Sequence, residues 1–116
     1  MNNVLIIGGR SISRMMLRTL IEENYPGISV SEADCIEQGL SYYAVQEFDG
    51  VVLEVNSTGA DGLDFMPEIQ AIFPSAQIVM LTGNFQDHLQ AKAEALGLQF
   101  FTKPATLDKV NHFINS

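Results

Sequence analysis

Short runs of apolar residues alternate along the chain with longer segments in which apolar residues recur every three or four positions. Continuous apolar runs are typical of strands that are buried on both faces of a parallel sheet. Strands are expected at residues 4–7, 28–33, 49–55, 77–81 and 98–102. Helices are expected after each of them, at residues 11–24, 36–46, 63–73, 85–96 and 106–115. This alternation predicts a doubly wound α/β fold, a five-stranded parallel sheet with helices on both faces and right-handed crossovers.

The spacing of apolar residues also predicts which side of each helix is buried. In the first helix, Ser11 is expected to act as the N-terminal cap, and one face is expected to lie on the sheet. The residues spaced for that face are Ile12, Met15, Met16, Leu20 and Ile21. The residues expected to point inward from the second helix are Ile36, Leu40, Tyr43 and Ala44. Gly97 follows the fourth helix and is a good C-terminal cap.

Composition narrows the class of protein without changing this fold. Residues 1–116 are expected to form a single domain, because no linker, repeat or low-complexity tract divides them. Six Lys and Arg against fourteen Asp and Glu give a net charge of −8, which repels phosphate backbones and anionic lipid. Direct binding to nucleic acid or to a membrane is therefore not expected, and a basic partner surface suits the chain better. Cys35 is the only cysteine, which excludes an internal disulfide and fits a cytoplasmic location.

Candidate chemistry lies where the predicted strands end. In an open parallel sheet, ligands gather beyond the carboxyl ends of the strands. The residues at these ends are Gly8, Gly9, Glu54, Thr82, Lys103 and Pro104. On one edge they bring together a carboxylate, a hydroxyl and an ammonium group, so a cluster of acids does not drive the chemistry there.

This arrangement resembles the receiver domain of two-component response regulators, and the likeness covers nearly the whole chain. Receivers have a flavodoxin-like (βα)5 fold. They carry an acidic pair after the first strand, a phosphoacceptor Asp ending the third, a Thr or Ser ending the fourth, and a Lys-Pro after the fifth. Thr82, Lys103 and Pro104 match this pattern, as does the Asp61-Gly62 step after the third strand.

The departures from the receiver pattern concern the phosphorylation site itself. Gly8 and Gly9 occupy the acidic-pair positions, and Glu54 occupies the phosphoacceptor position. In a typical receiver the acids hold Mg²⁺, which needs oxygen ligands in near-octahedral geometry. Glu54 supplies too few ligands, and its oxygens lie one methylene further out than those of Asp, which spoils in-line attack. The resemblance therefore implies an atypical receiver with no metal, no cofactor and no catalytic residue, which does not accept a phosphoryl group.

Two hypotheses follow for Glu54. In the first, its carboxylate pairs with Lys103 and hydrogen-bonds Thr82, which biases the domain permanently toward the active-like arrangement. In the second, it pairs with Lys103 or Arg10 only to satisfy a semi-buried charge, and no switching remains. The sequence leaves both open.

The resemblance also assigns a switch residue and a partner surface. Phe100 matches the aromatic switch position of receivers, and a role in the core is the alternative for it. Its neighbour Phe101 should face the other side of the sheet and belong to the core. The partner surface of the family is built by the fourth helix, the fifth strand and the last helix. In this chain that surface is expected to include Phe85, Asp87, Gln90, Phe100 and Lys109.

Other candidate sites are weaker. Gly8-Gly9 fails the dinucleotide-binding fingerprint, and an anion held by Arg10 or Arg14 at the start of the first helix is less favoured than two solvated arginines. His88 and His112 lie on different predicted helices without other ligands at metal spacing, which predicts surface histidines.

The sequence thus favours a phosphorylation-independent protein-interaction module in signal transduction. Two alternatives stay open: a receiver still phosphorylated by a histidine kinase in a phosphorelay, and a flavodoxin-like domain that binds a small anion. The partner, the pathway and homodimerisation also stay open, as does the choice between a free-standing domain and the N-terminal part of a longer regulator.

Overall fold

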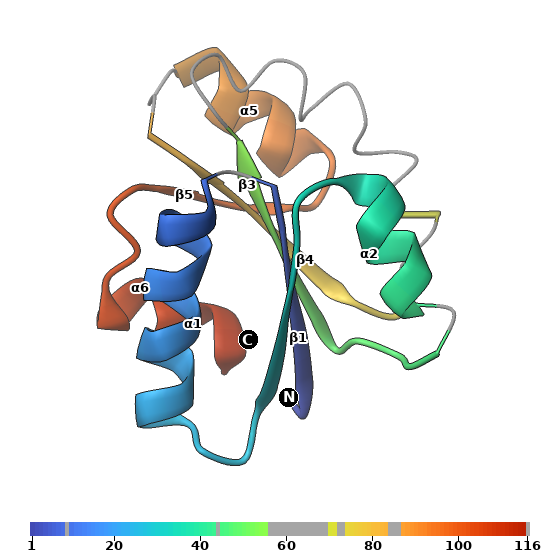
Figure 1. The fold of residues 1–116 in the computed structure, drawn as a ribbon. Coiled ribbons are helices and arrows are strands. Elements are labelled where there is room, and N and C mark those ends of the chain that lie inside the picture. The colour runs from blue at the N-terminus through green and yellow to red at the C-terminus, as the bar shows by residue number, and fades with distance from the viewer. Residues whose placement is uncertain (9, 44, 56–69, 72–73, 84–86, 116) are drawn as a thin grey trace.

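The computed structural model contains one sheet of five parallel strands (Figure 1). The structure describes residues 1–8, 10–43, 45–55, 70–71, 74–83 and 87–115. The strands are β1 (Asn3–Gly8), β2 (Ser29–Ala33), β3 (Gly50–Val55), β4 (Gln77–Thr82) and β5 (Gln99–Thr102). The helices in the described part are α1 (Ser11–Asn24), α2 (Ile36–Tyr43), α5 (Asp87–Ala95) and α6 (Leu107–Ile114). The strand order is β2-β1-β3-β4-β5, so the predicted doubly wound α/β fold is confirmed.

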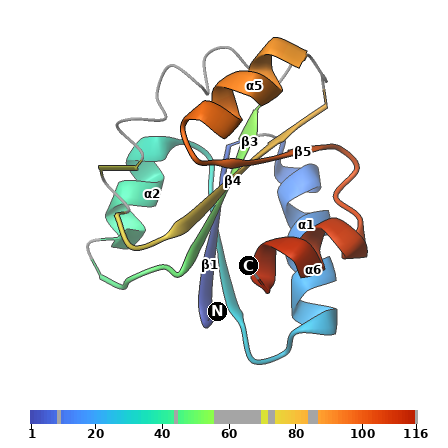
Figure 2. The same cartoon turned by 180° about the vertical axis from the view of Figure 1, so that it is seen from behind.

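Helices cover both faces of this sheet. In both views α1 and α6 lie on one face, and α2 and α5 lie on the other (Figures 1 and 2). Successive residues of a strand point to opposite faces. Leu5 and Ile7 of β1 therefore join the core cluster on the α2 and α5 side, while Val4 and Ile6 join the cluster on the α1 and α6 side. This burial on both faces explains why the strands are continuous apolar runs in the sequence.

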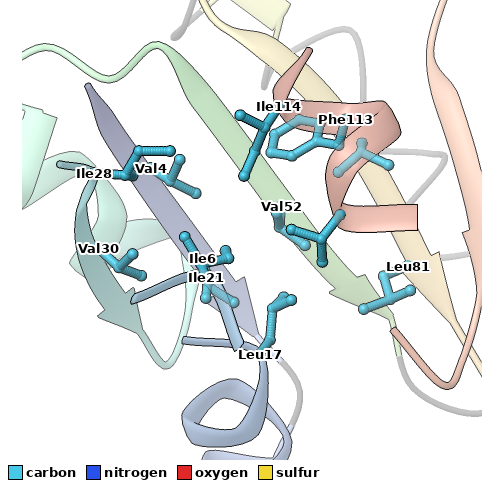
Figure 3. Close-up of a cluster of buried hydrophobic side chains, with 12 residues drawn as sticks. Val4, Ile6, Leu17, Ile21, Ile28, Val30, Val52, Leu81, Phe113 and Ile114 are labelled. Atoms are coloured by element: carbon cyan, nitrogen blue, oxygen red, sulfur yellow. The ribbon is translucent and has the colours of Figure 1, made fainter. Parts of the chain in front are cut away.

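The cluster beneath α1 and α6 supports the edge at which the candidate site lies (Figure 3). Phe113 and Ile114 of α6 lie near Val52 of β3, and Leu17 of α1 and Leu81 of β4 lie toward the arrowhead ends of the strands. Full burial of such a side chain contributes about 1.5–3 kcal/mol. Packing of this kind fixes α1 and α6 against the sheet, and Leu17 and Leu81 form apolar support beneath the site.

The buried face of α1 differs from the predicted one. Three residues expected to be buried are more than half exposed: Ile12, Met15 and Met16. The residues buried against the sheet are Arg14, Leu17 and Ile21, at helical spacing i, i+3 and i+7. The prediction is confirmed for Ile21, and Leu20 packs partly buried against the same cluster. It was wrong for the other three residues because it followed apolar residues alone, and the true stripe begins with an arginine.

Several element ends also differ from expectation. Helix α2 ends at Tyr43 instead of residue 46, and a turn follows in which the backbone N–H of Val45 donates to the Tyr42 carbonyl at 3.0 Å. Leu40, expected to point inward, is 39% exposed. Ala44, nearly all of the predicted helix at 63–73, and residues 85–86 at the start of the predicted helix at 85–96 lie outside the described residues. The described side chains do not include those of Ile36 and Tyr43.

Helix caps follow the predictions in part. Ser11 is the first residue of α1 instead of its cap, and Arg10 occupies the cap position without a side-chain cap hydrogen bond. Gly97 terminates the turn after α5 with φ of 75°, and its N–H donates to the Glu94 carbonyl at 3.0 Å, as expected of a C-terminal cap. Helix α6 is capped by Thr106, whose hydroxyl oxygen accepts from a backbone N–H one turn later.

Candidate functional site at the carboxyl ends of the strands

The carboxyl ends of β1, β3, β4 and β5 meet at one edge of the sheet, where the candidate residues lie. Gly8 pairs with Glu54 across β1 and β3, and Thr82 pairs with Thr102 across β4 and β5. Lys103 follows Thr102 directly, and its backbone N–H donates to the Thr82 carbonyl at 2.7 Å. The parallel register therefore brings a carboxylate, a hydroxyl and an ammonium group to the same edge, as predicted.

Glu54 carries the buried carboxylate of this edge, and its side chain is only half satisfied. The residue is 4% exposed. Its Oε1 accepts a hydrogen bond from Ser13 Oγ at 3.0 Å, whereas its Oε2 is buried and has no hydrogen-bond partner in the protein. Burial raises the pKa of the Glu54 carboxyl above its ordinary value, against the opposing effects of the Lys103 charge, the Ser13 hydrogen bond and the Arg14 charge. The site thus contains a desolvated carboxylate with one buried oxygen that lacks a hydrogen-bond donor.

The partners that the sequence suggested for Glu54 do not bond to it directly. Within the described part of the chain, no ion pair joins Glu54 to Lys103 or to the exposed Arg10. Lys103 acts on the carboxylate only through its electrostatic field. The hydrogen bonds of the described residues likewise include none from Thr82, which is fully buried, to Glu54. Sequence reasoning missed Ser13, a small polar residue that gave no signal before the orientation of α1 was known.

Gly8 occupies a position that only glycine fits well. Its φ is 81°, a left-handed conformation that residues with a Cβ rarely adopt. A Cβ built there lies 2.9 Å from the backbone carbonyl oxygen of Glu54 in the neighbouring strand. An acidic side chain at this position therefore requires the end of β1 or β3 to move. Gly9, the second acidic-pair position of the resemblance, lies outside the described residues.

Arg14 corrects the expectation that both early arginines are solvated. Arg10 is exposed, but Arg14 is 5% exposed. Its guanidinium donates to the Gly8 carbonyl at 3.0 Å and to Asp34 Oδ1 at 2.5 Å, and its Nε lies 3.4 Å from Glu32 Oε1. These contacts tie α1 to the carboxyl ends of β1 and β2. They also fix a positive charge beside the edge of the sheet.

The groups at this edge do not match the ligand requirements of Mg²⁺. Mg²⁺ prefers oxygen ligands in octahedral geometry and is usually held by carboxylates together with water or phosphate oxygens. The described residues contain no group of three His, Cys, Asp or Glu side chains that could hold a metal ion. Glu54 offers a carboxylate with one oxygen already bonded to Ser13, and Arg14 places a guanidinium nearby. The described donor set therefore does not fit the ion.

A cleft of about 570 Å³ opens beside Glu54. Ser13, Glu54 and Lys103 supply its polar groups. The apolar residues that line it are Met16, Leu17, Leu20, Leu81, Pro104 and Ala105. The peptide bond between Lys103 and Pro104 is cis. The cleft thus lies between α1 and the segment that follows β5, and its volume falls within the range of about 300–1,000 Å³ common for ligand pockets.

The two consecutive aromatic residues of β5 face opposite sides of the sheet, as predicted. Phe100 packs partly buried against the core cluster on the α2 and α5 side. Phe101 packs against the cluster on the α1 and α6 side, and its ring meets the His112 ring edge-on with centroids 5.7 Å apart. Phe101 is also partly buried, and its packing agrees with the predicted structural role; the partial burial of Phe100 is compatible with either of the roles considered for it.

The surface expected to bind partners is described only in part. The Lys109 ammonium donates to the carbonyl oxygens of Thr102 at 2.5 Å and Pro104 at 3.1 Å, which ties α6 to the segment after β5. Gln90 of α5 is half-buried, and its amide donates to a glutamate on the same helix. Phe85 and the side chain of Asp87 lie outside what the structure describes.

Comparison with known proteins gives the class. The family model of the response regulator receiver domain matches residues 4–115. The chain therefore belongs to the response regulator receiver domain family of two-component signalling. Members of this family are signalling domains and not catalytic enzymes, and they interact with kinases and other proteins.

Individual relatives are distant in sequence. The response regulator UvrY of Escherichia coli is 28% identical over 118 residues, which cover 100% of this chain and 54% of UvrY. The KDP operon transcriptional regulatory protein KdpE of Escherichia coli is 27% identical, with 90% of this chain and 45% of KdpE covered. The chemotaxis protein CheY of Listeria monocytogenes is 26% identical, with 95% and 92% covered. The chain thus spans about half the length of the first two relatives and nearly all of CheY.

Solved structures show the same fold. The signal receiver domain of a DNA-binding response regulator from Colwellia psychrerythraea matches with a TM-score of 0.84 at 21% identity, over 99% of this chain and 96% of that one. A response regulator from Burkholderia pseudomallei, solved with a phosphorylated aspartic acid and a calcium ion, matches with a TM-score of 0.75 at 20% identity, over 96% of this chain and 65% of that one. No helix in the described part of this chain is long and apolar enough to cross a membrane.

Proposed function

We propose that residues 1–116 form an atypical receiver domain that acts as a protein-interaction module without being phosphorylated. In this proposal Glu54 takes the phosphoacceptor position, and Gly8 and Gly9 take the positions of the acidic pair. The observation that carries it is the buried Glu54 carboxylate beside a strand end that has no room for a side chain at Gly8. A cytoplasmic location is part of the same proposal.

The charges and the geometry of this edge both disfavour phosphoryl transfer. Transfer of a phosphoryl group is assisted by metal ions that neutralise the developing charge and hold the oxygens in line. Glu54 is a single carboxylate with one oxygen engaged by Ser13, and the guanidinium of Arg14 is a fixed cation whose contacts hold it to β1 and to Asp34. The described part of this edge therefore lacks the ligands for a metal, and the longer side chain alters the position of the attacking oxygen.

The same arrangement favours a domain held in one state. Receiver switching depends on a change of charge at this edge, whereas the Glu54 charge is built into the chain. Thr82 and Lys103 are retained around it, and Phe100 lies partly buried on β5. We propose that partners bind the surface formed by α5, β5 and α6, with Phe100 at the switch position. Self-association through this surface is an outcome that a sedimentation experiment would reveal.

Chemical phosphorylation provides the test. The purified protein, incubated with acetyl phosphate and Mg²⁺ and analysed by intact mass, is expected to gain no phosphoryl group. The Burkholderia pseudomallei regulator that carries a phosphorylated aspartic acid is the positive control. Glu54→Asp is expected to stay unlabelled as well, because restoring the acceptor does not restore the acidic pair. Stoichiometric labelling of the native chain would instead support a conventional phosphorelay role, and thermal stabilisation by inorganic phosphate alone would support an anion-binding domain.

A further inference from the structure

We propose that the cleft beside Glu54 binds a small neutral molecule that carries a hydroxyl group on an apolar body, as a phenol or a medium-chain alcohol does. The proposal comes from three features of the residues that line one cleft: Glu54 with its unbonded Oε2, Lys103 with its ammonium, and an apolar wall to which α1 contributes three side chains. It rests on the proposed function in one respect, since it requires that neither Mg²⁺ nor a phosphoryl group occupies this edge.

The Glu54 carboxylate can accept a hydrogen bond from a donor group of the ligand. Ser13 engages Oε1 at 3.0 Å, and Oε2 is left without a protein donor although the residue is 4% exposed. A buried acceptor without a partner costs about 1–3 kcal/mol, and a ligand that supplies the missing hydrogen bond recovers this cost. Glu54 is one of the residues that line the cleft, and its Oε2 is itself buried, so the ligand hydroxyl bonds to this oxygen once the Glu54 side chain turns toward the cleft.

The charges around the cleft select a neutral ligand. The buried Glu54 carboxylate repels an anion. The Lys103 ammonium repels a cation, and Arg14 adds a second positive charge nearby. Among the described residues, Lys103 has no ion pair or side-chain hydrogen bond, so its ammonium is available to donate. A hydroxyl group donates and accepts at once. It can therefore bond to Glu54 and to Lys103 without adding charge to a partly desolvated site.

The remaining walls accommodate an apolar body. Leu17 and Leu81 are buried and form the inner surface, and Met16 and Leu20 of α1 line the cleft further out, together with Ala105. Met16 is 66% exposed, and unbranched methionine side chains adapt readily to the shape of a bound molecule. Covering these side chains removes apolar surface from water, which gives the ligand binding energy beyond its polar head.

A matched pair of probes tests the donor requirement. 4-Propylphenol can donate to Glu54, whereas 4-propylanisole has the same apolar body and an oxygen that only accepts. Titration of each into the ¹⁵N-labelled chain, in EDTA and without Mg²⁺, is followed through the amide signals of Ser13, Glu54 and Lys103. Saturable shifts are expected with the phenol, and binding of the ether is expected to be at least about tenfold weaker, as one hydrogen bond to a charged group implies.

Three variants make the test specific. In Glu54→Gln the amide oxygen can keep the Ser13 hydrogen bond, so the open position becomes an NH₂ donor, and the preference for the phenol over the ether is expected to vanish. Glu47→Gln changes an exposed glutamate that precedes β3 and does not line the cleft, so both affinities should stay unchanged. Met16→Ala alters an exposed side chain of the outer wall and should weaken both probes by a similar factor.

The possible results separate clearly. Equal binding of phenol and ether to the native chain, or no saturable shift with either, overturns the proposal and leaves a cleft filled by water. A preference that survives in Glu54→Gln overturns it as well, because the donor then goes elsewhere. These experiments use no phosphoryl donor, so their failure leaves the outcome of acetyl phosphate labelling unaffected. If acetyl phosphate labels Glu54, a phosphoryl group can occupy this edge, and that result refutes the proposed function itself.

Discussion

Replacing Gly8 with alanine is expected to destabilise the domain by about 2–5 kcal/mol, from two separate causes. The first is the φ of 81°, at which a residue with a Cβ carries a strain of about 1–2 kcal/mol. The second is the contact of 2.9 Å between the new Cβ and the Glu54 carbonyl oxygen. That oxygen belongs to β3, which is paired with β1 on one side and β4 on the other, so it cannot shift easily. Overpacking of this kind costs about 1–3 kcal/mol.

Two other glycines separate these causes. Gly97 has a similar φ of 75°, but no atom lies within 4 Å of a Cβ built there, so Gly97→Ala should show only the strain. Gly27 has neither a positive φ nor a neighbour within 4 Å, and Gly27→Ala should be close to neutral. The difference between the variants at Gly8 and Gly97, about 1–3 kcal/mol, then measures the close approach of β1 to Glu54.

Urea unfolding of the three variants provides the measurement. The midpoint is expected to fall in the order Gly27→Ala, Gly97→Ala, Gly8→Ala, at an unchanged dependence of the free energy of unfolding on urea. If Gly8→Ala is no less stable than Gly97→Ala, the strand end can accommodate a side chain. The close approach of β1 to Glu54 would then not explain why an acidic residue is missing at this position.

Three further predictions concern charged groups. Arg14→Met should lower the free energy of unfolding by about 1–3 kcal/mol in urea, because Gly8 and Asp34 lose its hydrogen bonds, and an unchanged midpoint would contradict a structural role. Folding raises the pKa of the Glu54 carboxyl above its ordinary value of 4.5. The protonated carboxyl therefore stabilises the folded state below pH 4.5, and this stabilisation is lost as the pH rises through the pKa of the folded state. Glu54→Gln should therefore gain stability relative to the parent as the pH rises above 4.5, and a flat difference would refute this. Hydrogen bonds from two backbone N–H groups lower the Asp49 pKa, so its stabilisation is present above the ordinary pKa and lost as the pH falls through the lowered one. Thermal melts of Asp49→Asn should thus show the deficit shrinking in acid, and a deficit that persists there would point to another cause.

The fold could be predicted because its main determinant is local and repetitive. Strands buried on both faces require continuous apolar runs, and such a run at residues 4–7 lies inside β1 as the structure has it. The register of a parallel sheet then brings the strand ends to one edge, so the neighbourhood of Glu54, Thr82 and Lys103 followed from strand order alone. Periodicity was less reliable for α1, where the buried stripe contains Arg14 and the apolar residues Met15 and Met16 face solvent.

The contacts inside the site could not be predicted, since they depend on side-chain direction and not on position along a strand. The proximity of Lys103 to Glu54 was foreseen, but the charge acts from beyond direct ion-pair distance. The hydrogen bond from Ser13 requires the rotation of α1 about its axis, which three polar contacts of Arg14 help to fix. The φ of Gly8 likewise results from the turn between β1 and α1, and a glycine in the sequence permits that value without requiring it.

The central claim is that the domain has no functional phosphorylation site, and a titration with Mg²⁺ and beryllofluoride tests this most directly. Beryllofluoride with Mg²⁺ imitates a phosphorylated carboxylate, so it binds where a receiver holds its metal and phosphoryl group. We expect the amide signals of Gly8, Glu54 and Thr82 to show no saturable change, while the Burkholderia pseudomallei regulator responds in parallel. Saturable shifts of these signals that require both Mg²⁺ and beryllofluoride would contradict the claim and would indicate a functional phosphorylation site.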